Sequence, residues 1–207
     1  MREVTKEVPK RGRAQDKKNM KEKDLYSAAY DLFTTKGIQN TAIDDIVKKA
    51  GVAKGTFYLY FKDKYDIINK IILQKSSMVI KEAMEKTKER TFDSFTDMFL
   101  FNVDYIIEYF KDNKLMLKLI NKNFSWGVYR RAIMQPEQHA DMREIVAVFI
   151  TNMKALGIDE EECEKTLFMI IELIGSVCYS SIILEEPYGI DSMKPTLFKT
   201  IEKMLKA

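Results

Sequence analysis

The chain has 207 residues, of which 46% are hydrophobic and 31% are charged, a composition typical of one or two soluble globular domains. Its 8 glycines and 4 prolines are too few for a collagen-like chain or for long disordered linkers. No run of 18 uncharged apolar residues occurs and residues 1–16 contain no apolar leader, so we expect a cytoplasmic protein outside the membrane.

Positive charge is concentrated in the N-terminal third of the chain. Residues 1–75 hold 17 Lys and Arg against 10 Asp and Glu, a net charge of +7, whereas residues 76–207 hold 17 against 21, a net charge of −4. A basic N-terminal segment followed by a mildly acidic remainder is expected to bind a polyanion such as nucleic acid. The alternative is a basic surface that is only solvated.

The first predicted helix follows a polar segment. Residues 1–18 are rich in Lys and Arg and are predicted to form a flexible basic arm. From about Met20 to Lys36, apolar residues recur at the spacing of one helical stripe. Gly37 follows in the place where a residue with left-handed backbone ends a helix.

Two short helices are predicted next. Thr41 is the expected N-cap of the first, with Asp44 three residues later as its capping-box acid. This helix ends at Gly51, and residues 54–61 form the second. Two short helices joined by a glycine turn have the layout of a helix-turn-helix, and neither would be stable without packing against the helix before them.

The rest of the chain is also predicted to be helical, so the expected fold class is all-α. Asp63 is a candidate N-cap for a long helix from Lys64 to about Lys88, which would be about 37 Å long at 1.5 Å per residue. No strand pattern competes with the helical spacing. Further apolar stripes predict helices over residues 95–110, 115–120, 142–156, 159–184 and 195–205.

The run from Thr41 to Lys64, TAIDDIVKKAGVAKGTFYLYFKDK, resembles the N-terminal signature of the TetR (TetR/AcrR) family of transcriptional regulators. The resemblance implies a helix-turn-helix DNA-binding domain over residues 19–63. It also implies an effector-binding and dimerisation domain over residues 64–207. Residues 1–18 would precede both as the basic arm.

The resemblance and the chemistry of the motif together suggest DNA contacts. Gly55 would let the backbone approach DNA closely, and an early position in the second short helix places Thr56 near base edges. Lys54 and Lys64 begin helices, where an ammonium group and free N–H groups can bind phosphate together. The predicted DNA-binding residues are Thr41, Lys54, Gly55, Thr56, Tyr58, Tyr60 and Lys64.

The aromatic residues of the motif divide into two groups. Phe57 and Phe61 share one helix face and are predicted to be core, which leaves Tyr58 and Tyr60 for DNA. One position departs from the family pattern, because Ala53 stands where a small hydroxyl residue most often caps the recognition helix. Loss of that cap costs about 1 kcal/mol and one expected phosphate contact.

The basic arm has two possible roles. Lys10, Arg11 and Arg13 could reach a minor groove, as basic arms of DNA-binding proteins do. A solvated tail would have the same composition.

The segment 159–184 is apolar on almost all sides, so more than one of its faces must be covered. We expect the body of the domain to cover one face and a second subunit to cover the other, with residues 195–205 completing a four-helix homodimer interface. The alternative is a fully central helix in a monomer.

Aromatic and methionine residues are frequent in the C-terminal part, which is typical of an adaptable apolar pocket and also of a plain core. Glu172 is a carboxylate within an apolar run, so it could pair with a ligand cation or with an arginine, or it could face solvent. The candidate ligand-binding residues are Phe101, Tyr105, Trp126, Phe149 and Glu172.

Catalytic chemistry is not expected, and the sequence suggests no cofactor and no metal site. The chain has one histidine, and its two cysteines are not spaced as a zinc site. Cys163 lies in an acidic first turn, which should raise the pKa of its thiol.

The sequence therefore predicts a homodimeric repressor that binds a palindromic double-stranded DNA operator and is released by an apolar small molecule. The alternative is a DNA-binding or partner-binding dimer whose C-terminal domain only dimerises. A cavity inside the C-terminal domain would favour the first interpretation, and a fully packed core would favour the second.

Overall fold

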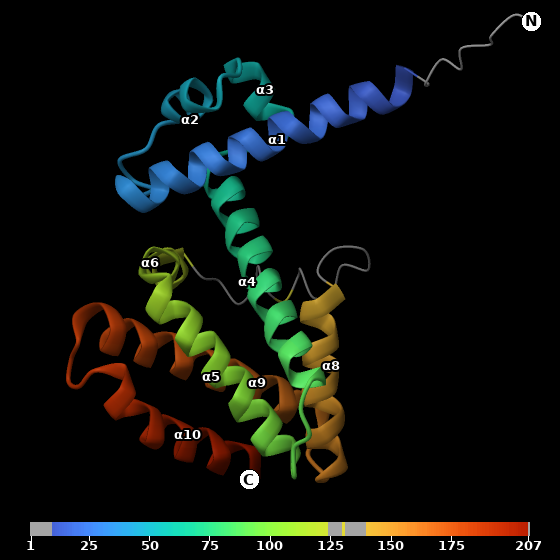
Figure 1. The fold of residues 1–207 in the computed structure, drawn as a ribbon, viewed down its shortest axis with the longest axis vertical. Helices are drawn as coiled ribbons and strands as arrows, with labels where there is room; N and C mark the ends of the chain where they lie inside the picture. The colour runs from blue at the N-terminus through green and yellow to red at the C-terminus, as the bar shows by residue number, and fades with distance from the viewer. Residues whose placement is uncertain (1–9, 124–129, 131–139, 207) are drawn as a thin grey trace, which may run out of the picture. The chain divides into compact units, whose positions relative to one another are not determined.

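The computed structural model describes residues 10–123, 130 and 140–206, and within these residues it contains helices and no strand (Figure 1). The chain forms two compact units, Met1–Ile71 and Ile72–Ala207. The division lies within the long helix α4, Lys64–Lys88, rather than after residue 63. The first turns of α4 belong to the N-terminal unit, where Ile67 and Ile68 are fully buried.

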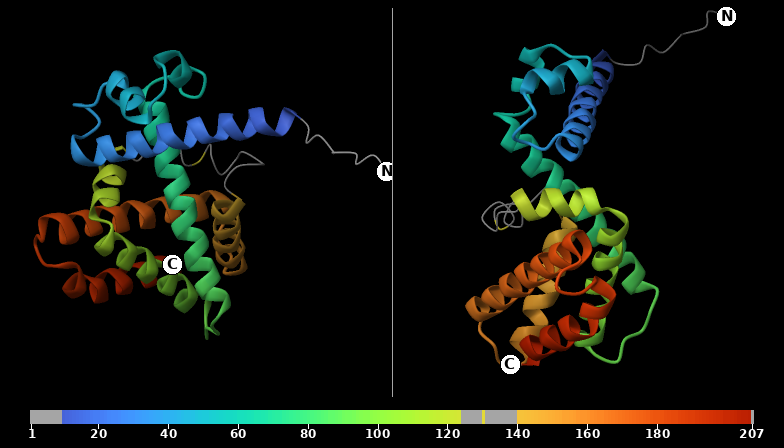
Figure 2. Two further views of the ribbon diagram at one scale, coloured as in Figure 1. Left: turned by 45° about the horizontal axis from the view of Figure 1, so that its top comes forward. Right: turned by 90° about the vertical axis from the view of Figure 1, so that its left-hand side faces the viewer.

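The N-terminal unit is built on α1, Lys10–Thr35. The short helices α2, Ile43–Ala50, and α3, Lys54–Tyr58, lie on the same side of α1 in both Figure 1 and Figure 2. Apolar side chains from all of these helices form the core, as the helical stripes predicted. Its buried members include Leu25, Ala28, Ala29, Leu32, Phe33, Ile46, Val47, Phe57 and Phe61.

Helix α1 begins at Lys10, earlier than the predicted start near Met20. The flexible arm predicted for residues 1–18 is therefore helical from Lys10 onward. Once a helix has nucleated on a packed stripe, each added residue extends it at little cost, and Lys, Arg and Gln are good helix formers. Residues 1–9 and the side chains of residues 10–18 lie outside the description, so a groove contact by Lys10, Arg11 and Arg13 stays a prediction.

Two glycines end helices of the N-terminal unit with left-handed backbone. Gly37 has φ of +80° and Gly51 has φ of +66°, conformations that side-chain-bearing residues rarely adopt. The amide of Gly37 donates to the carbonyl of Phe33, and that of Gly51 donates to Lys48. The sequence prediction of these two helix ends is confirmed.

The start of α2 differs from the prediction by one residue. Ala42, not Thr41, is the N-cap, and its amide donates to the carboxylate of Asp45 at 3.2 Å. Asp45 therefore takes the position predicted for Asp44. The Thr41 side chain turns inward instead, and its hydroxyl donates to the carbonyl of Gly37 at 2.8 Å. This bond fastens the loop to the end of α1 and leaves Thr41 only 1% exposed.

The C-terminal unit contains the rest of α4 and a bundle of further helices. The predicted helices are confirmed, with bounds that differ by a few residues. They are α5 (Phe95–Asp112), α6 (Lys114–Asn123), α8 (Ala140–Ala155), α9 (Glu160–Cys178) with the π-helical turn η1 (Tyr179–Leu184), and α10 (Ile190–Lys206).

Helix α10 begins at Ile190, five residues before Pro195, which was predicted to lie in its first turn. The amides of Ser192 and Met193 donate to the carbonyl of Gly189, which starts the helix upstream of the proline. Pro195 is exposed, so the carbonyl that loses its helical donor there can bond water. Helices α9 and α10 run side by side in opposite directions (Figures 1 and 2).

Helix α9 begins at the N-cap Asp159, whose carboxylate accepts from the amide of Glu162 at 3.1 Å. By length and composition alone Glu160–Leu184 could cross a membrane, although the segment is not free of charged residues. The core helix of a soluble protein passes the same test. One third of its most apolar window is buried within the chain, with Cys163, Leu167 and Ile170 facing the core.

Candidate nucleic-acid interface and ligand cavity

The exposed side of α3 and the following turn carries most of the predicted DNA-binding residues. Tyr58 is 53% exposed, and Gly55 is exposed with no atom within 4 Å of the position that a Cβ would take. Thr56 and Tyr60 are half-buried. We call these four residues, with Lys54 and Leu59, the recognition surface.

The aromatic residues divide as the sequence predicted. Phe57 is 0% exposed and Phe61 is 1% exposed, with their ring centroids 5.4 Å apart. The ring of Tyr26 on α1 packs edge-on against Phe61 at 5.3 Å. These buried rings fix α3 and so determine the direction in which Tyr58 projects.

Lys54 begins α3 and is paired within the protein. Its ammonium lies 2.8 Å from the carboxylate of Asp44 on α2, and both side chains are more than half exposed. The hydrogen bond from Lys54 to Asp44 raises the pKa of the lysine, so the ammonium is held in its charged form. Ala53 is the N-cap of α3 and supplies no side-chain bond, as expected. A phosphate that bound Lys54 would have to compete with Asp44.

Lys64 and Thr41 do not have the environment that was predicted for phosphate contacts. The Lys64 ammonium donates to the carbonyls of Ile38, Gln39 and Thr41 at 2.8, 3.3 and 3.3 Å. It therefore holds the loop between α1 and α2, where carbonyls left after the end of a helix need donors. The Thr41 hydroxyl is buried against Gly37 and is not presented to DNA.

Leu59 is a feature that sequence reasoning missed. It is 79% exposed, more than its neighbour Tyr58, and its amide ends α3 by donating to the carbonyl of Thr56. Its apolar side chain would suit a thymine methyl group. Its position in the sequence could have indicated this exposure. Leu59 stands between Tyr58 and Tyr60, which were both predicted to contact DNA, and it is not on the helix face that Phe57 and Phe61 share.

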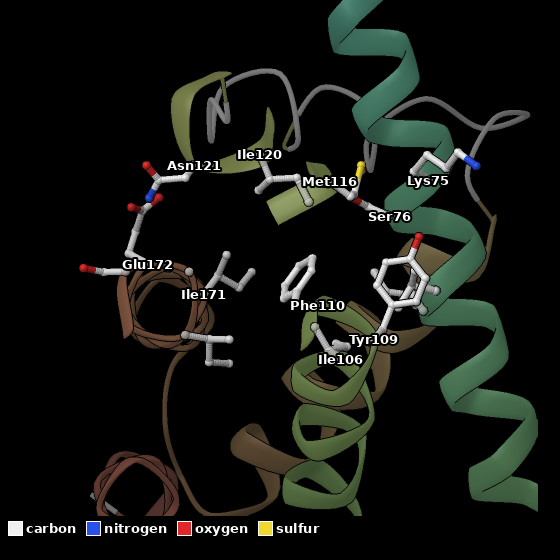
Figure 3. Close-up of a pocket in the computed structure, with 15 residues that line it drawn as sticks. Lys75, Ser76, Ile106, Tyr109, Phe110, Met116, Ile120, Asn121, Ile171 and Glu172 are labelled. Atoms are coloured by element: carbon white, nitrogen blue, oxygen red, sulfur yellow. The ribbon is translucent and has the colours of Figure 1, made fainter. Parts of the chain in front are cut away.

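The C-terminal unit contains a cavity of about 370 Å³ between α4, α5, α6 and α9 (Figure 3). The volume is within the range of small-molecule sites. Its wall is mainly aliphatic and aromatic, with a few polar side chains. The lining residues are Lys75, Ser76, Val79, Ile80, Ile106, Tyr109, Phe110, Met116, Ile120, Asn121, Ile171, Glu172, Ile174, Gly175 and Ser176.

Polar residues occupy different sides of this cavity. Asn121 and Glu172 lie close together at one side, and Lys75 lies at the opposite side, on α4 (Figure 3). Asn121, Glu172 and Ser176 are exposed, so the cavity opens to solvent between α6 and α9.

Of the four predicted ligand-binding residues that the structure describes, only Glu172 lines the cavity. Phe149 is 1% exposed in the core beside Phe99. Phe101 stacks under the guanidinium of Arg90, and the hydroxyl of Tyr105 donates to Glu82 at 3.2 Å. These three side chains do not line this cavity, because their helix faces point to other neighbours. Trp126 lies outside the described residues.

The cavity residues that sequence reasoning missed include Ile106, Phe110, Met116 and Ile120. They come from two helices and were read as parts of core stripes. A stripe of apolar residues looks the same whether it faces a packed core or an empty space, so the sequence offered no signal that separates the two.

The two cysteines show no sign of reactive chemistry. Both are buried, and burial raises the pKa of Cys178 to about 12. Burial, with Asp159 as a secondary cause, also raises the pKa of Cys163, in the direction predicted from its acidic turn. In the described part of the chain, no three His, Cys, Asp or Glu side chains are grouped to hold a metal ion.

Comparison with known proteins agrees with this geometry. Residues 25–71 match the family described as bacterial regulatory proteins, tetR family. The HTH-type transcriptional regulator YvdT of Bacillus subtilis is 26% identical over 191 residues, which are 87% of this chain and 93% of that protein.

Solved structures share the fold. A TetR-family transcription regulator from Shewanella sp. PV-4 has a TM-score of 0.66 at 14% identity, covering 87% of this chain and 95% of that one. The transcriptional regulator FadR of Bacillus subtilis in complex with stearoyl-CoA has a TM-score of 0.59 at 18% identity, covering 86% and 96%. With the signature run in place, residues 25–71 belong to the tetR family of bacterial regulatory proteins, and the chain as a whole shares the fold of TetR-family regulators.

Proposed function

We propose that this transcriptional regulator is a homodimeric repressor that an apolar small molecule releases from a palindromic operator. The observation that carries the proposal is the apolar cavity of about 370 Å³ in the unit that does not contain the recognition surface. A core that served only for dimerisation would be expected to be packed, since interiors contain few voids larger than a water molecule.

The DNA-binding part of the proposal rests on the recognition surface. Tyr58 and Leu59 are exposed beside Lys54, and two buried phenylalanines hold α3 beneath them. Lys54 would contact phosphate, while Thr56, Tyr58 and Leu59 would contact base edges or sugars. Thr41 is buried and Lys64 is bonded to backbone carbonyls, so we do not expect either of them to contact phosphate.

The dimer would form mainly through α9. Its exposed face carries Phe168 at 37% and Met169 at 49% exposure, within a segment that is apolar enough to pass for a membrane span by length and composition. Exposed apolar residues on such a helix support a partner surface. The exposed residues of α10 within 195–205, such as Lys199 and Lys203, are polar, so we expect α10 to contribute the rim of the interface.

Coupling between ligand and DNA would pass through α4. Lys75 to Ile80 of this helix form part of the cavity wall, and its first turns are part of the N-terminal unit. A ligand that binds one position of α4 more tightly than another shifts the population between them. Couplings of this kind are commonly about 1–3 kcal/mol, which corresponds to about 5- to 150-fold in operator affinity. The FadR structure with stearoyl-CoA supports a ligand with a long apolar part.

The test begins with selection of an operator from random DNA by the purified full-length chain. Decanol, a neutral apolar probe, is then titrated while operator affinity is followed by fluorescence anisotropy. We expect decanol to weaken operator binding in the wild-type protein. We expect no effect of decanol in Gly175→Leu, whose new side chain would enter the cavity, because no atom lies within 4 Å of the added Cβ.

Gly189→Leu is the matched control, since Gly189 also has open space around it and lies outside the cavity. It should respond to decanol as the wild-type protein does. Sedimentation of all three proteins checks that the dimer is retained. If decanol binds the cavity and operator affinity does not change, the alternative of a ligand-independent dimer is correct. If decanol tightens operator binding, the ligand is a co-repressor.

A further inference from the structure

One side of the cavity opening carries a negative charge, the carboxylate of Glu172. Among the described residues that line the cavity, Glu172 is the only one with a carboxylate, and it lies next to Asn121 (Figure 3). Ser176 follows Glu172 by four residues on α9 and so lies on the same helix face. These three side chains form what we call the cavity rim.

Asn121 lies near the end of the described part of α6 and faces Glu172 of α9 across the opening (Figure 3). Lys75, the positive lining residue, is on the opposite side, and its amine is drawn pointing away from the cavity centre (Figure 3).

The interior behind the rim is apolar. Val79, Ile80 and Met116 are buried, and with Ile106 and Phe110 they provide a surface that favours hydrocarbon over water. At about 30 Å³ for each water-sized group, a cavity of this volume holds about 12 such groups. A hydrocarbon chain of about ten carbons with a small polar head would fit.

We propose that the cavity binds a lipophilic cation, with its hydrocarbon part inside and a protonated amine at the rim beside Glu172 and Asn121. The ammonium would donate hydrogen bonds to the Glu172 carboxylate and to the Asn121 side-chain oxygen. An anionic head at the same place would face the Glu172 carboxylate. This inference rests on the proposed function and names the charge of its ligand.

The test compares three probes of equal chain length that differ in head charge at pH 7: decylamine, decanol and decanoate. Binding to the full-length protein is measured directly by calorimetry, and operator affinity is measured in parallel. Because Glu172 is exposed in the single chain, we expect decylamine to bind about fivefold more tightly than decanol, the upper limit for an exposed ion pair. Decanoate should bind more weakly than decanol.

Two variants separate the rim from other charges. In Glu172→Gln the preference for decylamine over decanol should disappear, and decanol affinity should stay unchanged. Glu164→Gln is the matched control, because Glu164 is on the same helix but pairs with Arg130 and does not line the cavity. It should retain the preference.

The outcomes distinguish this inference from the proposed function. If all three probes bind equally and weaken operator binding equally, the inference is wrong and the ligand-responsive repressor stands. If decanoate binds most tightly, the site takes an anionic amphiphile and Lys75 is the relevant charge. If decylamine binds preferentially but no probe changes operator affinity, the inference stands and the repressor mechanism fails. A Glu172→Gln dimer that dissociates in sedimentation would instead assign Glu172 to the subunit interface.

Discussion

The two units differ in how their functional residues are distributed along the chain. The recognition surface of the N-terminal unit comes from one short run, residues 54–60, supported by buried rings directly beneath it. The cavity of the C-terminal unit is lined by four helices, with residues drawn from 75 to 176. A local motif can be recognised in sequence with its chemistry attached, whereas a cavity exists only after distant helices have packed.

The difference between the two units is tested most directly by removing a buried side chain that supports the recognition surface. Phe57→Ala deletes a fully buried ring, and such truncations cost about 3–5 kcal/mol. We expect hydrogen exchange to show loss of protection in residues 19–71 and retained protection in residues 95–112 and 140–206. Operator binding should be lost together with the protection of residues 19–71.

Leu59→Ala is the control for this truncation, because Leu59 is 79% exposed and its loss should change stability by less than about 0.5 kcal/mol. Loss of protection in both units of Phe57→Ala at once would show that the two units unfold together.

The second prediction concerns Lys64, where a phosphate role and a structural role give opposite results. Lys64→Met removes bonds to three backbone carbonyls, and we expect a loss of about 1.5 kcal/mol in urea unfolding. Lys62→Met, at an exposed neighbouring position, should be neutral. If Lys64→Met keeps full stability but reduces the salt dependence of operator binding by about one unit of slope, the lysine contacts phosphate after all.

These cases show what the sequence could provide. Helix positions, the burial of Phe57 and Phe61 and the left-handed glycines Gly37 and Gly51 follow from local spacing, and the structure confirms them. The cap of α2 was misplaced by one residue, because Thr41 and Ala42 are adjacent, and the bond from the Thr41 hydroxyl to the Gly37 carbonyl turns that side chain away from the start of the helix.

The lining of the cavity could not be predicted from the sequence in this way. Phe149 and Phe110 both lie in apolar stripes at helical spacing, but one is packed in the core and the other lines the cavity. The difference depends on which helix lies opposite, and that is not encoded within either stripe. Glu172 was identifiable because a carboxylate inside an apolar run is unusual wherever the helix packs.

The third prediction tests the recognition surface without disturbing its support. Tyr58→Ala should weaken operator binding by about tenfold, or about 1.4 kcal/mol, as expected for loss of one good base contact. Stability should hardly change, because the ring is 53% exposed. Tyr65→Ala is the control, since this tyrosine is 47% exposed on α4 outside the recognition surface. Equal losses in both variants would place the DNA contact elsewhere on the unit.

The fourth prediction concerns the pair of Lys54 and Asp44. Asp44→Asn removes the carboxylate that competes with phosphate for Lys54, so operator binding should tighten several-fold and depend more steeply on salt. Asp31→Asn is the matched control, because Asp31 pairs with Lys49 at 3.2 Å with similar exposure. If Asp44→Asn weakens binding, the carboxylate positions Lys54 for DNA instead of competing with it.

The smallest expected effect concerns Gly175, which lines the cavity. Gly175→Ala adds one methyl group within a helix, at a position where no atom lies within 4 Å of the new Cβ. Helix propensity alone should stabilise the protein by about 0.5–1 kcal/mol, because alanine loses less backbone entropy than glycine. The same methyl group takes space from the cavity, so decanol should bind slightly more weakly while stability, measured by urea unfolding, rises.

A variant that gained stability and also bound decanol more tightly would mean that the methyl group contacts the ligand and that the cavity is larger than the probe requires. A variant that lost stability would show that Gly175 is needed for close approach of another helix, which in this chain would be the α9 of a second subunit.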